Sequence, residues 1–174
     1  MAIREIVTVP DPVLRRKAQK VTKFDDKLQA LIDDMVETMR EAPGVGLAAP
    51  QIGVLEQVIV VEYFEKEEDE EREDAEAAPK RLYVVVNPEI TRTSSETVSG
   101  AEGCLSIPGY LGEVERFETI TVKGQNRRGQ PITLKLKDWT ARIFQHEIDH
   151  LNGILFTDRA TKVWKPEGPV EDTV

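Results

Sequence analysis

The sequence has very little cysteine and histidine: Cys104 is its one cysteine, and His146 and His150 are its two histidines. A lone cysteine cannot form an internal disulfide, which suits a reducing compartment. No apolar run approaches the roughly 20 residues that cross a bilayer, and the first residues, MAIREIVTVPDPVL, show no basic leader followed by an apolar block. We therefore expect a cytoplasmic protein with no membrane-spanning segment.

Basic residues are also in the minority, since 23 lysines and arginines stand against 32 acidic residues, a net charge of −9. Most of this excess lies in residues 65–76, EKEEDEEREDAE, which carry a net charge of −7. Such a run is too polar to bury, and it predicts a solvated, mobile insert over residues 65–80. The rest of the chain offers no basic face, so we expect no sequence-specific binding of nucleic acid.

The pattern of apolar residues predicts an α+β fold, in which short antiparallel or mixed β-sheets pack around a central metal-binding helix. The apolar spacing predicts an N-terminal amphipathic helix over residues 25–41, capped by Asp25 or Asp26. The metal-binding helix is expected over residues 138–151, with Asp138 as its cap. Strands are expected at residues 57–64, 82–86, 89–98, 113–122 and 131–137, and Pro88 is expected to interrupt the second of them.

One domain is expected over residues 1–174, because this length suits a single core and the sequence shows neither a repeat nor a linker. The acidic residues 65–80 would form an insert within it. Pro166, Gly168 and Pro169 predict a short irregular tail over residues 164–174 in place of a long terminal helix.

The stretch FQHEIDHLNG contains the pattern H-E-x-x-H. On a helix this spacing sets the imidazoles of His146 and His150 one turn apart, with the Glu147 carboxylate beside the first. At about 100° per residue, the two histidines share a side with Trp139 and Ile143. The opposite side is an apolar stripe formed by Ala141, Phe144, Ile148 and Leu151. The helix is thus apolar on one face and able to bind a metal ion on the other.

A catalytic metal site needs a third protein ligand and one open position. The metzincin peptidase pattern continues to a third histidine, but this sequence matches it only through Gly153 and has Phe156 at the last position. Thermolysin-like peptidases take a glutamate from a following helix, whereas the glutamates near this C-terminus lie among proline and glycine. Asp158 could serve an aspartate-ligand peptidase, so this alternative stays open.

Cys104 is the other candidate for the third ligand. It lies in AEGCLSIPG, a segment expected to be extended or turning. A thiolate and two imidazoles would make a borderline-soft site with three protein ligands and an open position. A structural metal site in a non-enzymatic domain is a further alternative, although such sites are usually closed by a fourth protein ligand and would leave Glu147 without a role.

Three stretches resemble the signature motifs of the peptide deformylase family and occur in the family's order: GVGLAAPQIG at 44–53, EGCLSIPG at 102–109 and QHEIDHLNG at 145–153. The resemblance implies one divalent metal ion held by Cys104, His146 and His150. Fe²⁺ is the expected ion, and Zn²⁺, Ni²⁺ or Co²⁺ would fit the same ligands. The resemblance further implies a hydrolase that removes the N-formyl group from the N-terminal formyl-methionine of newly synthesised polypeptides and releases formate.

The resemblance also implies how the residues would share the reaction. The expected nucleophile is a metal-bound water. Glu147 would take the proton of this water as general base and return it to the leaving amine as general acid. The side-chain amide of Gln51 and the backbone N–H of Leu105 would stabilise the oxyanion.

By the same resemblance, substrate binding would fall to Val45, Gly46, Glu102, Trp139 and Ile143. Gly46 would let the backbone approach an extended peptide closely, and the apolar members would line a pocket for the methionine side chain. The expected partners are N-formylmethionyl nascent peptides and, transiently, the ribosome exit region.

The sequence departs from the family pattern in two places. Many members carry an arginine a few residues after CLSIP, where this chain has Gly109, Tyr110 and Leu111. Many members also end in a long helix that is linked to ribosome docking, whereas a short irregular tail is expected here. These departures put in doubt the substrate contact of that arginine and a docking mode that depends on the helix.

Overall fold

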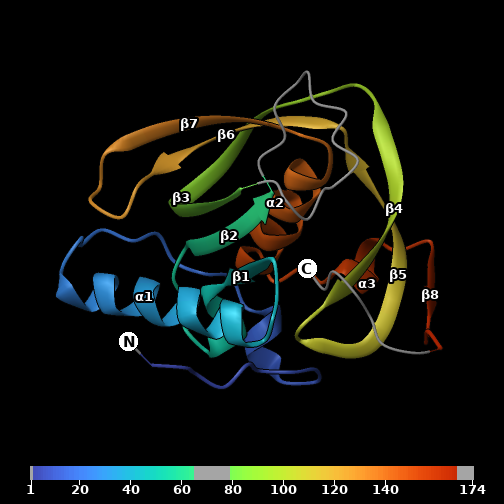
Figure 1. Ribbon diagram of the computed structural model, residues 1–174, viewed down its shortest axis with the longest axis horizontal. Coiled ribbons are helices and arrows are strands. Elements are labelled where there is room, and N and C mark those ends of the chain that lie inside the picture. The colour runs from blue at the N-terminus through green and yellow to red at the C-terminus, as the bar shows by residue number, and fades with distance from the viewer. Residues whose placement is uncertain (1, 65–78, 168–174) are drawn as a thin grey trace.

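The computed structural model describes residues 2–64 and 79–167, and these ranges contain two antiparallel sheets and three α-helices (Figure 1). The larger sheet has the strand order β1-β2-β3-β6-β7, with these strands at Gly46–Ala48, Val58–Phe64, Lys80–Thr93, Thr119–Gln125 and Pro131–Lys137. The smaller sheet has the order β4-β5-β8, at Thr97–Cys104, Ile107–Phe117 and Lys162–Trp164. The α-helices are α1 at Asp26–Glu41, α2 at Asp138–Leu151 and α3 at Phe156–Arg159, and the 3₁₀-helices are η1 at Pro12–Arg15 and η2 at Ala49–Ile52. The α+β class with small antiparallel sheets is confirmed.

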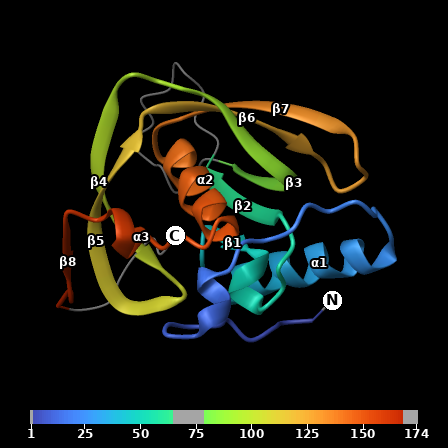
Figure 2. The same ribbon diagram turned by 180° about the vertical axis from the view of Figure 1, so that it is seen from behind.

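Strand β2 occupies the core because both of its faces are apolar. Val58 and Val60 pack in the cluster that contains the buried face of α1, whereas Ile59 and Val61 pack in the cluster that contains α2. Neighbouring residues on a strand point to opposite faces, and all four side chains are fully buried. Figures 1 and 2 show the result from both sides: α1 lies along β1 and β2, and α2 runs between the two sheets.

The start of α1 is as the sequence predicts, because the Asp25 carboxylate accepts a hydrogen bond from the backbone N–H of Leu28 at 3.1 Å. The start of α2 is different. Asp138 is its first residue, with φ of 55°, and Lys137 stands at the cap position, so the predicted Asp138 cap is wrong. Strand β7 runs directly into α2 without a loop, and aspartate tolerates the left-handed backbone that this sharp turn requires.

The predicted interruption at Pro88 is wrong, because β3 continues through it. The register of β3 against β6 shifts between Val86 and Glu89, and Asn87 there has φ of 53°. A proline cannot donate to the ladder and is tolerated at such a bulge. Pro88 therefore marks an irregularity within a strand and not its end.

Two other predicted strands each span a turn. Residues 89–98 cross from β3 to β4, and residues 113–122 cross from β5 to β6 at Glu118. Of the predicted acidic insert, residues 65–78 lie outside the described residues, and Lys80 already belongs to β3. Of the predicted tail, residues 168–174 lie outside them, and Trp164 ends β8. Among the helices of the described ranges, none is long and apolar enough to cross a membrane.

Candidate metal centre

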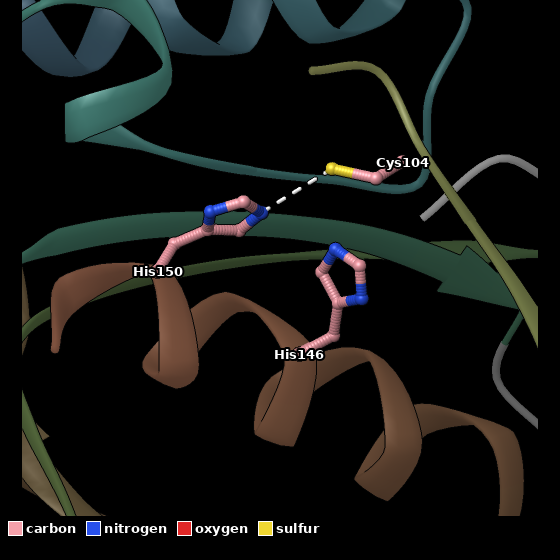
Figure 3. A group of neighbouring side chains, drawn as sticks. All are labelled: Cys104, His146 and His150. Carbon is pink, nitrogen blue, oxygen red and sulfur yellow. Dashed lines mark hydrogen bonds between the residues drawn. The ribbon is translucent and has the colours of Figure 1, made fainter. Parts of the chain in front are cut away.

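Three buried side chains meet between α2 and the β4–β5 turn. Figure 3 shows Cys104 facing His150, with His146 beside them on the preceding turn of α2. One ligand atom from each of the three residues lies within 4.8 Å of the others, and Sγ of Cys104 is 3.4 Å from Nε2 of His150. Each residue is at most 2% exposed. The structure thus brings together the three residues that the motifs suggest as metal ligands.

The β4–β5 hairpin delivers the thiol to α2. Cys104 is the last residue of β4 and pairs with Ile107, the first residue of β5. The strand register shifts between Glu102 and Cys104, and an irregularity of this kind changes the direction of nearby side chains. Leu105 follows the thiol directly in the turn, which places its backbone next to the cluster.

A hydrogen bond fixes the ring of His146. Its Nδ1–H donates to Oε1 of Glu102 at 2.9 Å. Burial alone would raise the pKa of the Glu102 carboxyl, but hydrogen bonds from Arg116 and His146 outweigh burial and hold this pKa below its usual range. The ionised carboxylate can only accept, so Nδ1 of His146 carries a proton, and Nε2 is the ring nitrogen that faces the cluster. Within the described residues this buried Nε2 has no hydrogen-bond partner.

Burial also sets the protonation of the other two ligand groups. It raises the pKa of the Cys104 thiol to about 12, and the charge of Glu147 adds to this effect. Burial lowers the pKa of His150 well below its usual 6.5, with further contributions from the charges of His146 and Arg116. A divalent cation would reverse the preference of the thiol and bind it deprotonated. A thiolate, two imidazoles and one remaining position form the donor set of a catalytic metal site, and the unpartnered imidazole nitrogen fits such an ion.

The carboxyl group of Glu147 adjoins the cluster. Oε1 of Glu147 lies 3.9 Å from Nε2 of His146, and neither carboxyl oxygen has a hydrogen-bond partner in the part of the chain that the structure describes. Burial, with the negative charge of Glu102 added, raises the pKa of Glu147 well above its usual 4.5. A buried carboxyl group without a partner costs stability, and a strongly shifted pKa beside ligand-type residues suits proton transfer.

Gln51 approaches the thiol from η2. Its Oε1 accepts a hydrogen bond from the backbone N–H of Ala48 at 2.9 Å. Its Nε2 donates to Oγ of Ser106 at 3.1 Å and lies 3.7 Å from Sγ of Cys104. Since Oε1 must face the Ala48 donor, the amide N–H groups face Cys104. Gln51 can therefore present a donor to a group that binds beside the thiol.

The residues suggested for the substrate pocket differ in exposure. Val45 and Trp139 are half-buried and pack against the α2 core, whereas Ile143 is fully buried inside it. Glu102 is fully buried too, and its contacts are with His146 and with arginines. Trp139 lines a hollow of about 190 Å³, and its Nε1 has no hydrogen-bond partner among the described residues.

Asp158, the alternative third ligand, lies outside this cluster. Its Oδ2 pairs with Nη1 of Arg15 at 2.5 Å and accepts the backbone N–H of Leu155 at 3.0 Å. Within the described residues, the group of ligand-type side chains that includes the histidine pair is completed by Cys104. The geometry therefore gives no support to an aspartate-ligand peptidase.

A family model described as Polypeptide deformylase matches residues 3–165. The chain belongs to the polypeptide deformylase family. It is therefore an enzyme, and the family membership that the three motifs predict is confirmed. The family's reaction is the removal of N-formyl groups from nascent peptides.

Named deformylases resemble this chain over nearly its whole length. The peptide deformylase of Desulforudis audaxviator is 47% identical over 165 residues, which cover 95% of this chain and 98% of the relative. The deformylase of Heliobacterium modesticaldum is 50% identical over 159 residues, which cover 91% and 95%. The crystal structure of the Thermotoga maritima deformylase has a TM-score of 0.80 at 41% identity and covers 93% of this chain and 100% of that one. A Met-Ala-Ser-bound class I type b deformylase from Acinetobacter baumannii has a TM-score of 0.81 at 38% identity, with 91% and 98% covered.

Sequence reasoning does not single out three charged residues that surround this deformylase centre. Arg116 donates two hydrogen bonds of 2.9 Å to Glu102, and Arg142 donates a third, of 2.7 Å. Asp149 accepts a hydrogen bond from Arg116 at 2.7 Å. The sequence signal for such residues is a charged side chain at a buried position of a strand or a helix. Their partners could not be read from it, because the contacts join segments that are 14 to 40 residues apart.

Proposed function

We propose that this protein hydrolyses the formyl group from the N-terminal formyl-methionine of nascent polypeptides and releases formate, and that Sγ of Cys104 and the Nε2 atoms of His146 and His150 would hold the divalent metal ion that the reaction needs. The observation that carries the proposal is the meeting of three buried ligand atoms within 4.8 Å of one another. Fe²⁺ is the ion we expect, and Zn²⁺, Ni²⁺ or Co²⁺ suit the same donors. When bound, the ion supplies Lewis acidity and brings the pKa of a coordinated water near neutrality.

Glu147 moves the proton in this proposal. Its carboxyl group is buried, has no hydrogen-bond partner among the described residues and lies beside His146. Burial raises the pKa of Glu147, and a carboxyl group whose pKa is raised both accepts and returns a proton near neutral pH. Glu147 takes a proton from the attacking water and delivers it to the amine that leaves.

Gln51 and Leu105 stabilise the charge that develops on the formyl oxygen. The N–H groups of Gln51 face Cys104, because its carbonyl oxygen is held by Ala48. The backbone of Leu105 follows Cys104 in the β4–β5 turn, and we assign its N–H as the second donor. Donors that are held in place before the reaction stabilise an oxyanion without reorganisation.

The peptide lies along β1 in this proposal. Among the described residues, β1 is an edge strand of the larger sheet and pairs only with β2, where Gly46 lies opposite Val61. A free strand edge binds an extended peptide through main-chain hydrogen bonds. Val45, Trp139 and Ile143 form the apolar wall for the methionine side chain. The Met-Ala-Ser named for the Acinetobacter baumannii structure supports a short methionyl peptide as ligand.

The test is formate release from formyl-Met-Ala-Ser by metal-free protein before and after it is loaded anaerobically with each of the four ions. We expect release only after loading, with intact Met-Ala-Ser as the other product. Acetyl-Met-Ala-Ser is the matched control and should be cleaved far more slowly. Cleavage of internal peptide bonds without formate would favour a peptidase, and a tightly bound metal with neither activity would favour a structural site.

A further inference from the structure

An alternating series of charged side chains leads from His146 towards the surface. Glu102 accepts the Nδ1–H of His146 at 2.9 Å. Arg116 donates to the same carboxylate through Nε and Nη2, both at 2.9 Å. Its remaining amino group, Nη1, donates to Oδ2 of Asp149 at 2.7 Å. Arg116 is therefore shared between two carboxylates, and one of them orients a proposed metal ligand.

The series ends at Arg159 of α3. Nε of Arg159 donates to Oδ2 of Asp149 at 2.6 Å, and Nη2 donates to Oδ1 at 3.0 Å. The side chains of Glu102 and Arg116 are 0% and 4% exposed and that of Asp149 is 11% exposed, whereas that of Arg159 is 46% exposed. Arg159 is thus the solvent-exposed end of a series whose other members are largely removed from water.

We propose that Arg159 is a positioning residue for the metal centre and acts through Asp149, Arg116 and Glu102 on the orientation of His146. The proposal rests on the proposed function, because it takes His146 as a metal ligand. It assigns a role in metal binding to a side chain that does not touch the ligands.

Arg159 can act on Glu102 because Asp149 and Glu102 share the guanidinium group of Arg116. Oδ2 of Asp149 accepts from Arg116 and from Arg159 at once. Without Arg159, the negative charge of Asp149 would be left to Arg116, which would be drawn towards Asp149 and away from Glu102. In a site largely removed from water, the attraction between Arg116 and Asp149 is screened only weakly. The carboxylate of Glu102 would then turn towards Arg142, its other partner at 2.7 Å, and the ring of His146 would lose its fixed orientation.

A simpler explanation is that Arg159 only holds α3 against α2. A second ion pair of α3 provides a matched control that tests this explanation. Asp158, the preceding residue of α3, pairs with Arg15 of η1 at 2.5 Å. Both arginines are about half exposed, at 53% for Arg15 and 46% for Arg159, and both hold the same short helix. The ion pair of Arg15 with Asp158 does not lead to His146, so Arg15→Gln removes a contact of α3 without breaking the series.

The experiment measures Co²⁺ binding to metal-free protein by chelator competition and by the visible spectrum of the bound ion. Outer partners of metal ligands are worth about 10–100-fold in affinity, and for the more distant Arg159→Gln we expect a loss of about threefold to tenfold. The d–d bands should shift as well, because they report ligand geometry. Arg15→Gln should bind and absorb like the unchanged protein, and Arg159→Lys should restore part of the affinity.

Two results would overturn the proposal. If Arg159→Gln and Arg15→Gln give the same affinity and spectrum, the series does not act on the metal centre, although the proposed function stands. If His146→Ala binds Co²⁺ as tightly as the unchanged protein, His146 is not a ligand, and the proposed function fails together with this inference. Urea unfolding of each variant shows whether a change in affinity merely follows a loss of folded protein.

Discussion

A carbon atom placed on Gly46 as a Cβ would lie 3.0 Å from both Cγ and Cδ of Glu147. The edge strand β1 and the proposed general base are therefore in contact, with no room for a side chain between them. The same atom would lie 3.0 Å from Cγ2 of Ile143, so α2 cannot easily give way. Close approach of the backbone is the reason for glycine at this position.

Gly46→Ala should therefore reduce activity. The methyl group would displace Glu147 or β1 by a few tenths of an ångström. A misplacement on the order of 1 Å can cost about 100-fold in rate, so for this smaller shift we expect a loss of about tenfold or less. The measurement is kcat/KM for formate release. Gly129→Ala, at the β6–β7 hairpin tip where φ is 84°, is the control: it should cost about 1 kcal/mol of stability and leave kcat/KM unchanged. Full activity of Gly46→Ala would contradict the contact.

Gln51→Ala should lower kcat with little change in KM. The variant removes one proposed donor to the oxyanion, a loss worth about 10²–10³-fold in kcat. Its metal content should be unchanged, because Gln51 reaches the thiol only through a long contact of 3.7 Å. Steady-state kinetics with metal analysis separate these effects. An unchanged kcat would remove Gln51 from the proposed reaction.

Cys104→Ser should weaken metal binding more than any change outside the ligand set. Outer partners of ligands are worth about 10–100-fold in affinity, so the loss of a ligand should reach or exceed that range. Dissociation constants from chelator competition provide the measurement. Asp158→Asn is the control and should bind metal normally, because its carboxylate pairs with Arg15. Normal metal binding by Cys104→Ser together with weakened binding by Asp158→Asn would favour Asp158 as the third ligand.

Asp34 links the N-terminal segment to α1 and predicts a pH dependence. The Ala2 backbone N–H donates to Asp34 at 2.7 Å and holds the pKa of this carboxyl below its usual 3.8; burial opposes this effect, and Arg4 adds to it. The folded protein therefore binds fewer protons than the unfolded chain near this pH. The stabilisation is complete above about pH 4 and fades as the pH falls further.

Asp34→Asn should accordingly lower the free energy of unfolding at pH 7 by about 1 kcal/mol. The difference from the unchanged protein should narrow between pH 4 and pH 3, as the carboxylate of the unchanged protein becomes protonated. Urea unfolding of both proteins at pH 7, pH 4 and pH 3 measures this difference in the free energy of unfolding. A difference that stays constant down to pH 3 would show that the charge of Asp34 contributes nothing.

Local signals predict much of the fold. The cap at Asp25 and the apolar spacing predict α1 to within one residue, and clean alternation predicts β7 at Pro131–Lys137. The ligand-type residues lie in short motifs, so their grouping can be anticipated before the chain is folded. The helix and the strand depend on residues that are close together in the sequence, whereas Cys104 lies 46 residues from His150 and is grouped with it only by the family resemblance of the motifs.

Features that depend on contacts between residues far apart in the sequence cannot be predicted from local patterns. The passage of β3 through Pro88 depends on a register shift against β6, which no local pattern encodes. The partners of Arg116 depend on how the β4–β5 hairpin sits against α2. A charged residue at a buried position shows that a partner is needed, but not which residue supplies it.

In the proposed deformylation Glu147 transfers the proton, and Glu147→Gln removes the group that does so. This variant keeps the size of the side chain and leaves the three ligands in place. Formate release from formyl-Met-Ala-Ser and metal content are measured on the same preparation. We predict one metal ion per chain, as in the unchanged protein, with kcat reduced by about 10²–10⁴-fold. Undiminished formate release by a fully metal-loaded Glu147→Gln variant would show that Glu147 does not transfer the proton.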